Sequence, residues 1–332
     1  MVKLEPEIDK TQLREMLARD YGVMVTDLAF VPAGWISACY RLAGNDGTQW
    51  FLKLQPLSGP QPTAASCPAF YLPLSLELRR GGWLPDIAYP IPTMRGGLWT
   101  FWDGWRVILH NHIDGQTVGL QGMTDDVVAR LARLVARMHQ ALPGLHLDVQ
   151  LFDTYALPFE VQVMDVLAAL QSSDLAATAG QQGLRDLIMP YQDDVLRAFH
   201  AARSLGEQVK AAHPPVVVCH TDLHGDNLML DEAGRLYILD WEGAILAPPE
   251  QDLVMFADGP QFREVFMPAY EAESGPFVPD PERLEFYSLR RLLEDLSDWV
   301  LHLYTGTQSA AQDAADLREL EDALALLSSL WE

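Results

Sequence analysis

The sequence predicts an α+β protein of two lobes, in which a small antiparallel sheet precedes a larger and mostly helical part. The chain has 332 residues, enough to bury a sizeable core and to form two lobes. Short runs with strand composition and tight-turn signals occupy the first third, and helical periodicity dominates the remainder. These observations together define the expected fold class.

The first elements follow from apolar spacing and from turn residues. Residues 11–21 repeat apolar side chains on one helical face, and Gly22 follows as a C-terminal stop, so a helix is expected. The next runs, LAFVPAG, ACYRLAG and QWFLKLQ, have strand composition. Residues 45–47, Asn-Asp-Gly, separate the last two runs and favour a hairpin.

A second helix and a second hairpin are expected before residue 114. The run FYLPLSLELRRGGW predicts a short helix that ends at the glycine pair. The turn pair Asp103-Gly104 joins GGLWTFW to WRVILHNHI. Beyond it, Thr124 is the expected N-cap of a helix that reaches Leu142. Short strands are expected around residues 216–243, and three further segments have helical periodicity: 153–212, 280–304 and 309–330.

Composition excludes some classes of protein. The formal net charge of −23 argues against nucleic-acid binding and fits cationic partners, although an ordinary acidic surface explains it too. Cys39, Cys67 and Cys219 are widely spaced, so neither a disulfide framework nor a structural zinc site is indicated. The sequence has no signal-peptide core and no membrane-spanning apolar run. We expect a cytoplasmic protein with no membrane partner, as a monomer or a dimer.

Residues 216–230, VVVCHTDLHGDNLML, gather several polar side chains behind an apolar run. In an extended conformation His220, Asp222, His224 and Asp226 would alternate onto one face, as in a metal-dependent hydrolase. Gly225 interrupts that alternation, and no second His-rich segment supplies further ligands. A polar loop could also use these side chains to satisfy its own backbone.

A different interpretation starts from spacing. His220, Asp222 and Asn227 form the pattern HxDxxxxN, and Asp240 lies thirteen residues after Asn227 in YILDWEG. Phosphoryl transfer needs one carboxylate that orients or deprotonates a hydroxyl, and an amide oxygen and a second carboxylate that hold magnesium. Because each motif follows a strand-like run, the two are expected side by side at one hairpin.

At these motifs the sequence resembles the aminoglycoside phosphotransferase family, the small-molecule relatives of protein kinases. HTDLHGDN resembles its catalytic loop, and ILDWEGA resembles its metal-binding motif. LAPPEQDL and RRLLEDLSDW are most similar to the spectinomycin phosphotransferase branch. The resemblance implies a bilobal protein-kinase-like fold. Residues 1–113 would form a nucleotide-binding N-lobe, and residues 114–332 a C-lobe with the catalytic loop and acceptor-binding helices.

The resemblance also implies roles for the loop residues. Asp222 becomes the catalytic base, and Asn227 and Asp240 become ligands of Mg²⁺, with ATP or GTP as the phosphoryl donor. His220 is a structural residue of the loop, and His224 and Asp226 are expected to form loop-stabilising hydrogen bonds. Glu242 is either a water-mediated metal contact or a solvent-facing carboxylate.

Lys53, at the end of the third predicted strand, is the candidate cation for the α- and β-phosphates. It is the only lysine between Lys10 and Lys210, and leucines flank it. The alternative is an exposed charge that protects a sheet edge. In the family a glutamate in the following helix pairs with this lysine. Glu77 is the candidate, although it lies near the helix end and could simply be exposed.

Two further segments are expected at the nucleotide. In the turn PAGWISACY, Gly34 and Ser37 could close over the phosphates through backbone N–H groups and the Ser37 hydroxyl. An ordinary hairpin turn is the alternative. Where the lobes join, Asn111, His112 and Ile113 are expected to contact the adenine ring through their backbone.

The acceptor site is expected on RRLLEDLSDWVLHL, where Glu294, Asp295 and Asp298 form an acidic stripe beside an apolar helix face. A protonated amine would offset their repulsion, whereas a solvated helix face needs none. The predicted reaction is Mg²⁺-dependent phosphorylation of a hydroxyl on a small, cationic aminoglycoside or aminocyclitol such as spectinomycin. A choline, homoserine or sugar kinase is the alternative, as is a nucleotide-binding regulator with little turnover.

Overall fold

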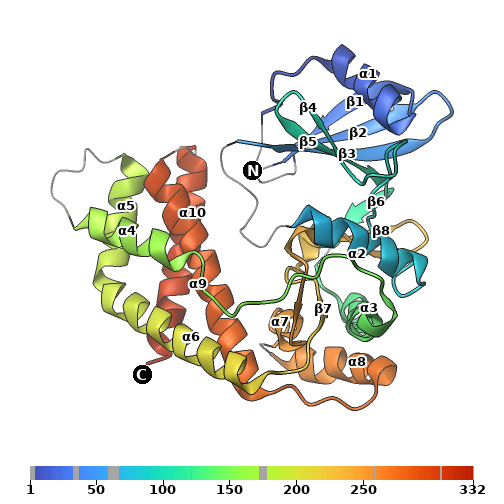
Figure 1. Cartoon of the computed structure of the whole chain (residues 1–332). Helices are drawn as coiled ribbons and strands as arrows, with labels where there is room; N and C mark the ends of the chain where they lie inside the picture. The colour runs from blue at the N-terminus through green and yellow to red at the C-terminus, as the bar shows by residue number, and fades with distance from the viewer. Residues whose placement is uncertain are drawn as a thin grey trace. The chain divides into compact units, whose positions relative to one another are not determined.

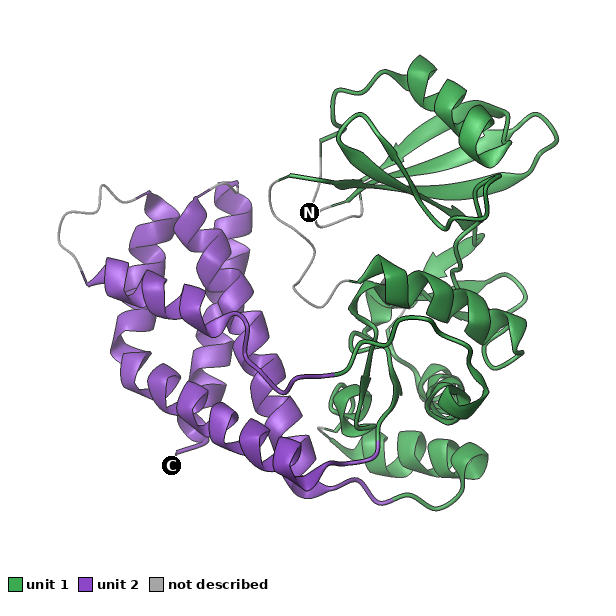
Figure 2. Ribbon diagram, in the orientation of Figure 1, with its two compact units in different colours: residues 1–152, 216–277 green, residues 153–215, 278–332 purple. Residues whose placement is uncertain are grey.

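The computed structural model describes residues 4–32, 37–58, 67–120, 122–171, 178–257, 259–306 and 309–331. The chain forms two compact units (Figure 2). Unit 1 comprises residues 1–152 and 216–277, and unit 2 comprises residues 153–215 and 278–332. These units do not divide the chain at position 113, because unit 1 contains residues on both sides of it. The expected boundary between an N-lobe and a C-lobe at residue 113 therefore stays a prediction.

Unit 1 begins with a helix over a five-stranded antiparallel sheet (Figure 1). Helix α1 (Lys10–Tyr21) is N-capped by Asp9 and ends at Gly22, whose φ of 70° suits glycine. Leu52 and Leu54 pack with α1 in one core cluster. The strand order is β1-β2-β3-β5-β4, and the predicted hairpins are confirmed. The strands are β1 (Val25–Val31), β2 (Ala38–Gly44), β3 (Gln49–Pro56), β4 (Thr100–Trp102) and β5 (Trp105–Asn111).

The opposite face of this sheet carries Lys53. Successive side chains of a strand alternate between faces, so Phe51 and Lys53 point away from the core that Leu52 and Leu54 share with α1. Directly paired residues share a face, and Lys53 pairs with Cys39 on β2 and Ile108 on β5. His110 on β5 pairs with Phe51 and therefore lies on this face too.

The remainder of unit 1 surrounds two short antiparallel ladders, β6-β8-β9 and β7-β10. The predicted helix after Thr124 is confirmed as α3, and the Thr124 side chain caps it. The short strands expected near residues 216–243 are also present. The α-helices and strands are α2 (Pro68–Arg80), β6 (Gly115–Thr117), α3 (Asp125–Ala141), β7 (Val217–Cys219), β8 (Leu228–Asp231), β9 (Leu236–Ile238), β10 (Ile245–Ala247), α7 (Glu250–Leu253) and α8 (Met267–Ser274). Short helical turns are η1 (Val118–Leu120), η2 (Leu142–Gly144), η4 (Gly225–Asn227), η5 (Trp241–Gly243) and η6 (Phe262–Phe266).

Unit 2 is helical in its described residues, as the periodicity predicted. One apolar cluster contains side chains from each α-helix that the structure describes in this unit. Asp153 is a buried anchor of this unit, because its carboxylate accepts from Arg290 Nη1 at 2.8 Å and from the Tyr287 hydroxyl at 2.9 Å. The helices are α4 (Glu160–Leu170), α5 (Ala179–Ile188), η3 (Met189–Tyr191), α6 (Gln192–Ala212), α9 (Pro281–Thr305) and α10 (Ala310–Ser329).

None of the helices in the described part of the chain combines the length and apolar character that crossing a membrane requires.

Candidate active site

Residues 220–227 form a loop between β7 and β8, and His220 ties it to the next strand. His220 Nδ1 accepts from the backbone N–H of Asp222 at 3.3 Å. The proton of the neutral ring therefore resides on Nε2, which donates to the Leu239 carbonyl at 2.7 Å. This carbonyl immediately precedes Asp240, so one imidazole joins the two predicted motifs.

Asp252 on α7 holds the loop from the other side. Its carboxylate is buried and accepts from the backbone N–H groups of His220 at 3.1 Å and Thr221 at 2.7 Å. His139 Nε2 donates to the same carboxylate at 3.0 Å. Thr221 has a φ of 76°, a left-handed conformation that costs a β-branched residue about 1 to 3 kcal/mol. The bonds to Asp252 stabilise this strained backbone.

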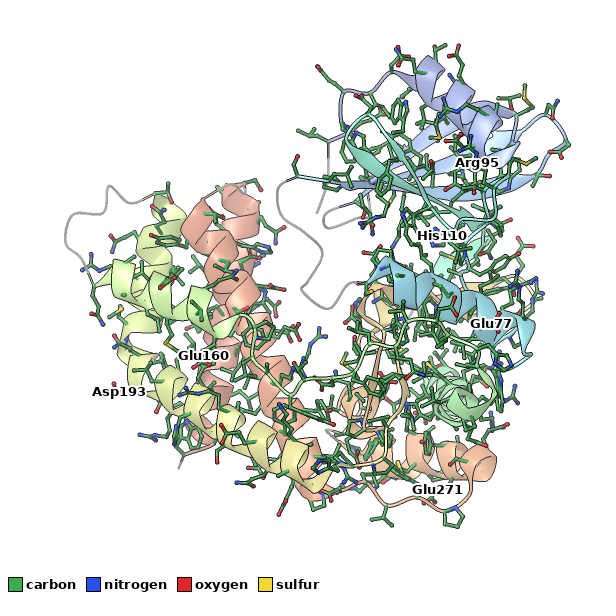
Figure 3. The ribbon with its side chains drawn as sticks, viewed as in Figure 1. Glu77, Arg95, His110, Glu160, Asp193 and Glu271 are labelled. Atoms are coloured by element: carbon green, nitrogen blue, oxygen red, sulfur yellow. The ribbon has the colours of Figure 1, made fainter. Side chains whose placement is uncertain are left out.

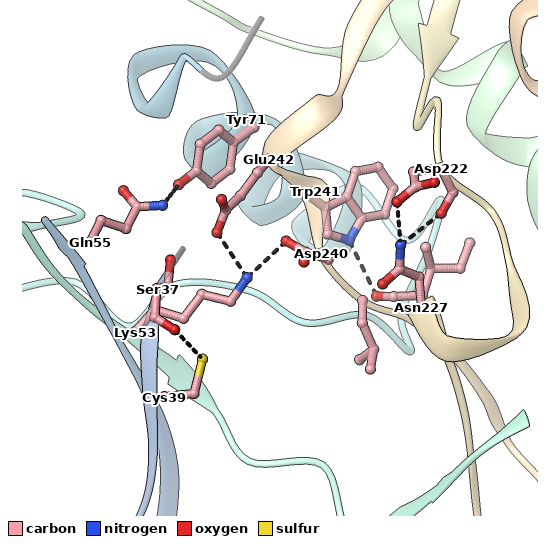
Figure 4. Close-up of polar contacts among 12 residues, drawn as sticks. Ser37, Cys39, Lys53, Gln55, Tyr71, Asp222, Asn227, Asp240, Trp241 and Glu242 are labelled. Atoms are coloured by element: carbon pink, nitrogen blue, oxygen red, sulfur yellow. Dashed lines mark hydrogen bonds and ion pairs between the residues drawn. The ribbon is translucent and has the colours of Figure 1, made fainter. Parts of the chain in front are cut away.

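Asp222 and Asn227 are joined directly (Figure 4). Asn227 Nδ2 donates to the Asp222 carbonyl at 2.9 Å and to Asp222 Oδ2 at 2.8 Å. Since the amide nitrogen faces Asp222, the amide oxygen Oδ1 points the other way. The structure thus brings the predicted base and one predicted metal ligand into contact.

Lys53 meets two carboxylates at this site (Figure 4). Its Nζ lies 2.8 Å from Asp240 Oδ1 and 2.8 Å from Glu242 Oε1. Burial opposes the ammonium charge, but the two carboxylates outweigh it and raise the pKa of Lys53. The Asp240 side chain is partly exposed, and the Lys53 ammonium outweighs the desolvation of its carboxyl and lowers its pKa. Asp240 has a φ of 53°, so the second motif also carries a left-handed residue.

Glu77, the sequence candidate for this ion pair, does not meet Lys53. It lies on α2 (Figure 3), and its carboxylate is 3.5 Å from Arg80 Nη1. Sequence reasoning gave Glu242 a metal-contact or solvent role and missed it as the partner of Lys53. The carboxylate that pairs with Lys53 comes from η5 and not from α2, and it lies two residues after Asp240. That spacing was visible in the sequence, but the distance to Lys53 was not.

The other nucleotide candidates are placed only in part. Ser37 is buried, and Gly34 lies outside the described residues. Asn111 joins the strand to the preceding segment, since its Oδ1 accepts from the Tyr89 N–H at 2.7 Å and its own N–H bonds the Tyr89 carbonyl. Partial burial lowers the pKa of His112. Nucleobase contacts at residues 111–113 stay a prediction.

A metal-dependent hydrolase would need several ligands close together at residues 220–226. Within the described part of the chain, these residues do not form such a ligand cluster. The one group that the described residues bring within ligand distance is His139, Cys219 and Asp252. Each of the three already has hydrogen bonds: His139 to Asp252, and Cys219 Sγ to the Ala247 carbonyl at 3.6 Å. In this structure the three residues are thus held together and to the fold by hydrogen bonds.

The acidic stripe lies on α9 in unit 2, so its relation to Asp222 stays a prediction. Asp295 pairs with Arg291 at 3.1 Å, one turn away on the same helix. Burial raises the pKa of Glu294, and Arg290 and Arg291 oppose that shift. Asp298 is exposed. The stripe is thus partly neutralised by arginines of its own helix.

Residues that can hold a divalent cation are present on the loops. Asn227 offers an amide oxygen and Asp240 a carboxylate, and hard oxygen donors of this kind suit Mg²⁺ or Ca²⁺. A sheet lysine beside this pair can bind phosphates, and Asp222 lies next to Asn227. This combination defines the class of kinase-like phosphotransferases.

The chain belongs to the phosphotransferase enzyme family, whose model matches residues 27–287. It is similar to the structure of a spectinomycin phosphotransferase in complex with ADP and spectinomycin, with 18% identity, a TM-score of 0.75 and coverage of 97% of this chain and 98% of that chain. It is also similar to an amicoumacin kinase in complex with AMP-PNP and Ca²⁺, with 16% identity, a TM-score of 0.63 and coverage of 95% and 94%. A choline/ethanolamine kinase family protein from Mesorhizobium loti matches with 19% identity, a TM-score of 0.55 and coverage of 97% and 94%.

These matches confirm the predicted kinase-like α+β fold and the family. They also confirm the enzyme class, a small-molecule phosphotransferase. Sequence identity to these structures is low, so their substrates remain properties of those proteins.

Proposed function

We propose that this enzyme transfers the γ-phosphoryl group of ATP or GTP, with Mg²⁺, to a hydroxyl of a small cationic aminoglycoside or aminocyclitol. One observation carries the nucleotide part of the proposal. Lys53 Nζ lies 2.8 Å from the carboxylates of Asp240 and Glu242. The segment that carries these two carboxylates is joined through His220 to the loop that carries Asp222. A single cation is thus held beside the groups that metal-assisted phosphoryl transfer requires.

Nucleotide binding would use the charges already gathered here. Lys53 would donate to oxygens of the α- and β-phosphates, which compete with its present carboxylate partners. Asn227 Oδ1 and Asp240 would hold the metal, which neutralises the charge on the phosphates. Glu242 would keep Lys53 oriented after Asp240 turns to the metal.

Asp222 would act on the acceptor. Its carboxylate would orient the acceptor hydroxyl and accept the proton while the hydroxyl oxygen bonds to the γ-phosphorus. The bond between the γ-phosphorus and the bridging oxygen breaks, and the nucleoside diphosphate leaves. Asn227 donates to Asp222 Oδ2 at 2.8 Å, and this bond would position the carboxylate for the acceptor hydroxyl.

The acceptor class is supported by the carboxylates of α9. Glu294 and Asp298 are one turn apart, with Asp295 beside them, and a protonated amine would lower the repulsion within this stripe. Among structural neighbours, the spectinomycin phosphotransferase is in complex with its namesake. If the acceptor is an antibiotic, the proposal extends to a role in resistance in the cytoplasm.

An ADP-release screen with Mg²⁺-ATP and Mg²⁺-GTP tests the proposal. The candidate acceptors are aminoglycosides, spectinomycin, choline, homoserine and sugars, and mass spectrometry identifies each product. Asp222→Ala and Asp240→Ala should each nearly abolish turnover, whereas the exposed Asp126→Ala should not. Choline or a sugar as best acceptor would support the alternative kinases, and nucleotide binding without turnover would support a regulator.

The acceptor residues have a separate test. A charge-assisted contact is worth about 1.5 to 3 kcal/mol, so Asp295→Ala or Glu294→Ala should raise the acceptor KM at least about tenfold. The nucleotide KM should stay within about twofold. If neither variant changes acceptor kinetics, or the best acceptor carries no positive charge, the cationic-acceptor proposal is wrong and the kinase assignment still stands.

A further inference from the structure

His224 lies within the catalytic loop and has contacts to three of its neighbours. Its Nδ1 accepts from the backbone N–H of Asp226 at 3.2 Å. Its Nε2 lies 3.2 Å from Asp222 Oδ2 and 3.1 Å from Asn227 Nδ2. The side chains of His224 and Asp222 are 40% and 37% exposed, so the pair borders solvent.

These contacts determine the tautomer of a neutral ring. A backbone N–H can only donate, so Nδ1 must be the unprotonated nitrogen and Nε2 must carry the proton. A protonated Nε2 cannot accept from the Asn227 amide, so that contact joins two donors. Of the two neighbours of Nε2, only Asp222 Oδ2 is an acceptor.

An amide flip of Asn227 would change this reasoning, but two contacts fix the amide. Asn227 Nδ2 donates to the Asp222 carbonyl at 2.9 Å and to Asp222 Oδ2 at 2.8 Å (Figure 4). A flip would direct the amide oxygen at both of these acceptors and lose both bonds. Of the two printed contacts of His224 Nε2, the Asp222 carboxylate oxygen at 3.2 Å is therefore the one to which an Nε2–H can donate.

We propose that His224 is a positioning residue that holds the Asp222 carboxylate through its Nε2–H. This inference rests on the proposed function, in which Asp222 acts on the acceptor hydroxyl. In this proposal Nε2–H of His224, 3.2 Å from Asp222 Oδ2, restrains the same carboxylate oxygen that accepts from Asn227 Nδ2 at 2.8 Å. His224 links this carboxylate to the loop backbone at Asp226, so the conformation of η4 and the orientation of the base are coupled.

Two substitutions separate this role from simple stabilisation of the loop. In His224→Asn the side-chain oxygen can replace Nδ1 as acceptor for Asp226, but residue 224 no longer supplies a donor to Asp222, which keeps only its bonds from Asn227. In His224→Gln the longer amide can supply a donor near the position of Nε2. We expect His224→Asn to lower kcat at least about tenfold with the nucleotide KM within about twofold, and His224→Gln to restore kcat to within about threefold of wild type.

The kinetic outcomes are decisive in both directions. Equal losses in both variants, or a loss expressed in KM alone, would mean that His224 only shapes the loop. Wild-type kcat in His224→Asn would overturn the proposal outright.

The ring tautomer gives a readout that needs no acceptor. In ¹⁵N-histidine NMR spectra of the full chain, the signals absent from His224→Asn identify this ring among the nine histidines. We expect the proton on Nε2 in the wild type at a pH where the ring is neutral. A proton on Nδ1 would refute the inference without affecting the kinase assignment, whereas the Nε2–H form without detectable phosphoryl transfer would refute the proposed function alone.

Discussion

Asp252→Ala is expected to destabilise the fold and to inactivate the enzyme. The Asp252 side chain has no exposed surface and accepts three hydrogen bonds, at 2.7 Å from Thr221 N–H, 3.1 Å from His220 N–H and 3.0 Å from His139 Nε2. The alanine variant leaves all three donors buried without this acceptor. It also releases the left-handed backbone at Thr221, because that φ of 76° depends on the same carboxylate.

The magnitude follows from these contacts. A buried donor left without a partner costs about 1 to 3 kcal/mol, and Asp252→Ala leaves three donors without this acceptor. The three losses share one cavity and are not additive, and relief of strain at Thr221 offsets about 1 to 3 kcal/mol. We expect Asp252→Ala to lower the free energy of unfolding by about 3 kcal/mol. The free energy of unfolding of Asp252→Asn should lie between that of the alanine variant and that of wild type.

Urea unfolding followed by tryptophan fluorescence measures this change, because the buried Trp241 ring contacts His220 with centroids 4.9 Å apart. Asp126→Ala is the matched control, since Asp126 pairs with Arg130 at the surface and such pairs contribute about 0 to 1 kcal/mol. The structural role given to Asp252 is wrong if the free energy of unfolding of Asp252→Ala lies within about 1 kcal/mol of wild type, or if Asp126→Ala loses as much unfolding free energy. The rate of ADP release is then compared for Asp252→Ala and Asp126→Ala at a temperature where both variants are folded. A lower rate in Asp252→Ala alone would show that the geometry of the catalytic loop has changed.

Three further predictions concern unit 1. Burial lowers the pKa of His110 to about 3, below its ordinary 6.5, so the unfolded chain binds a proton that the folded chain excludes as pH falls from 6.5 toward 3. Wild type should therefore lose about 2 kcal/mol more unfolding free energy between pH 6.5 and 5 than His110→Gln does, measured by urea unfolding. A Cβ at Gly225 would lie 3.1 Å from the backbone of Gly119, closer than ordinary packing, so Gly225→Ala should displace the catalytic loop and lower kcat at least about tenfold. Glu242→Gln weakens the orientation of Lys53 and should lower kcat/KM for nucleotide about tenfold in steady-state assays.

Matched variants control these effects. Gly97→Ala adds a Cβ with contacts of 3.5 Å, ordinary packing, and should leave kcat unchanged. Glu77→Gln removes a carboxylate that pairs only weakly with Arg80 and should leave nucleotide kinetics within about twofold of wild type. If Glu77→Gln impairs the enzyme as much as Glu242→Gln does, the glutamate of α2 is the functional partner after all. Equal acid sensitivity of His110→Gln and wild type would show that His110 is protonated normally in the folded state.

Local patterns in the sequence determined the secondary structure and the two motifs. The hairpin at residues 45–47 and the helix capped by Thr124 depend on turn chemistry and capping, which act over a few residues. The HxDxxxxN spacing likewise brings Asp222 and Asn227 together, because the two residues are only five positions apart in one loop. Such contacts are readable from a chain because they need no distant partner.

Only the tertiary structure decided which distant groups meet. Lys53 contacts Asp240 across 187 residues of sequence, and Glu242 across 189, because packing brings β3 against η5. Spacing within the helix after Lys53 pointed to Glu77, but no local rule indicates which of several carboxylates a lysine on the sheet will reach. Asp252 was missed for the same reason: its role arises from burial beneath a loop 31 and 32 residues away in sequence, and its three donors were brought to it by the folding of β7, α3 and α7.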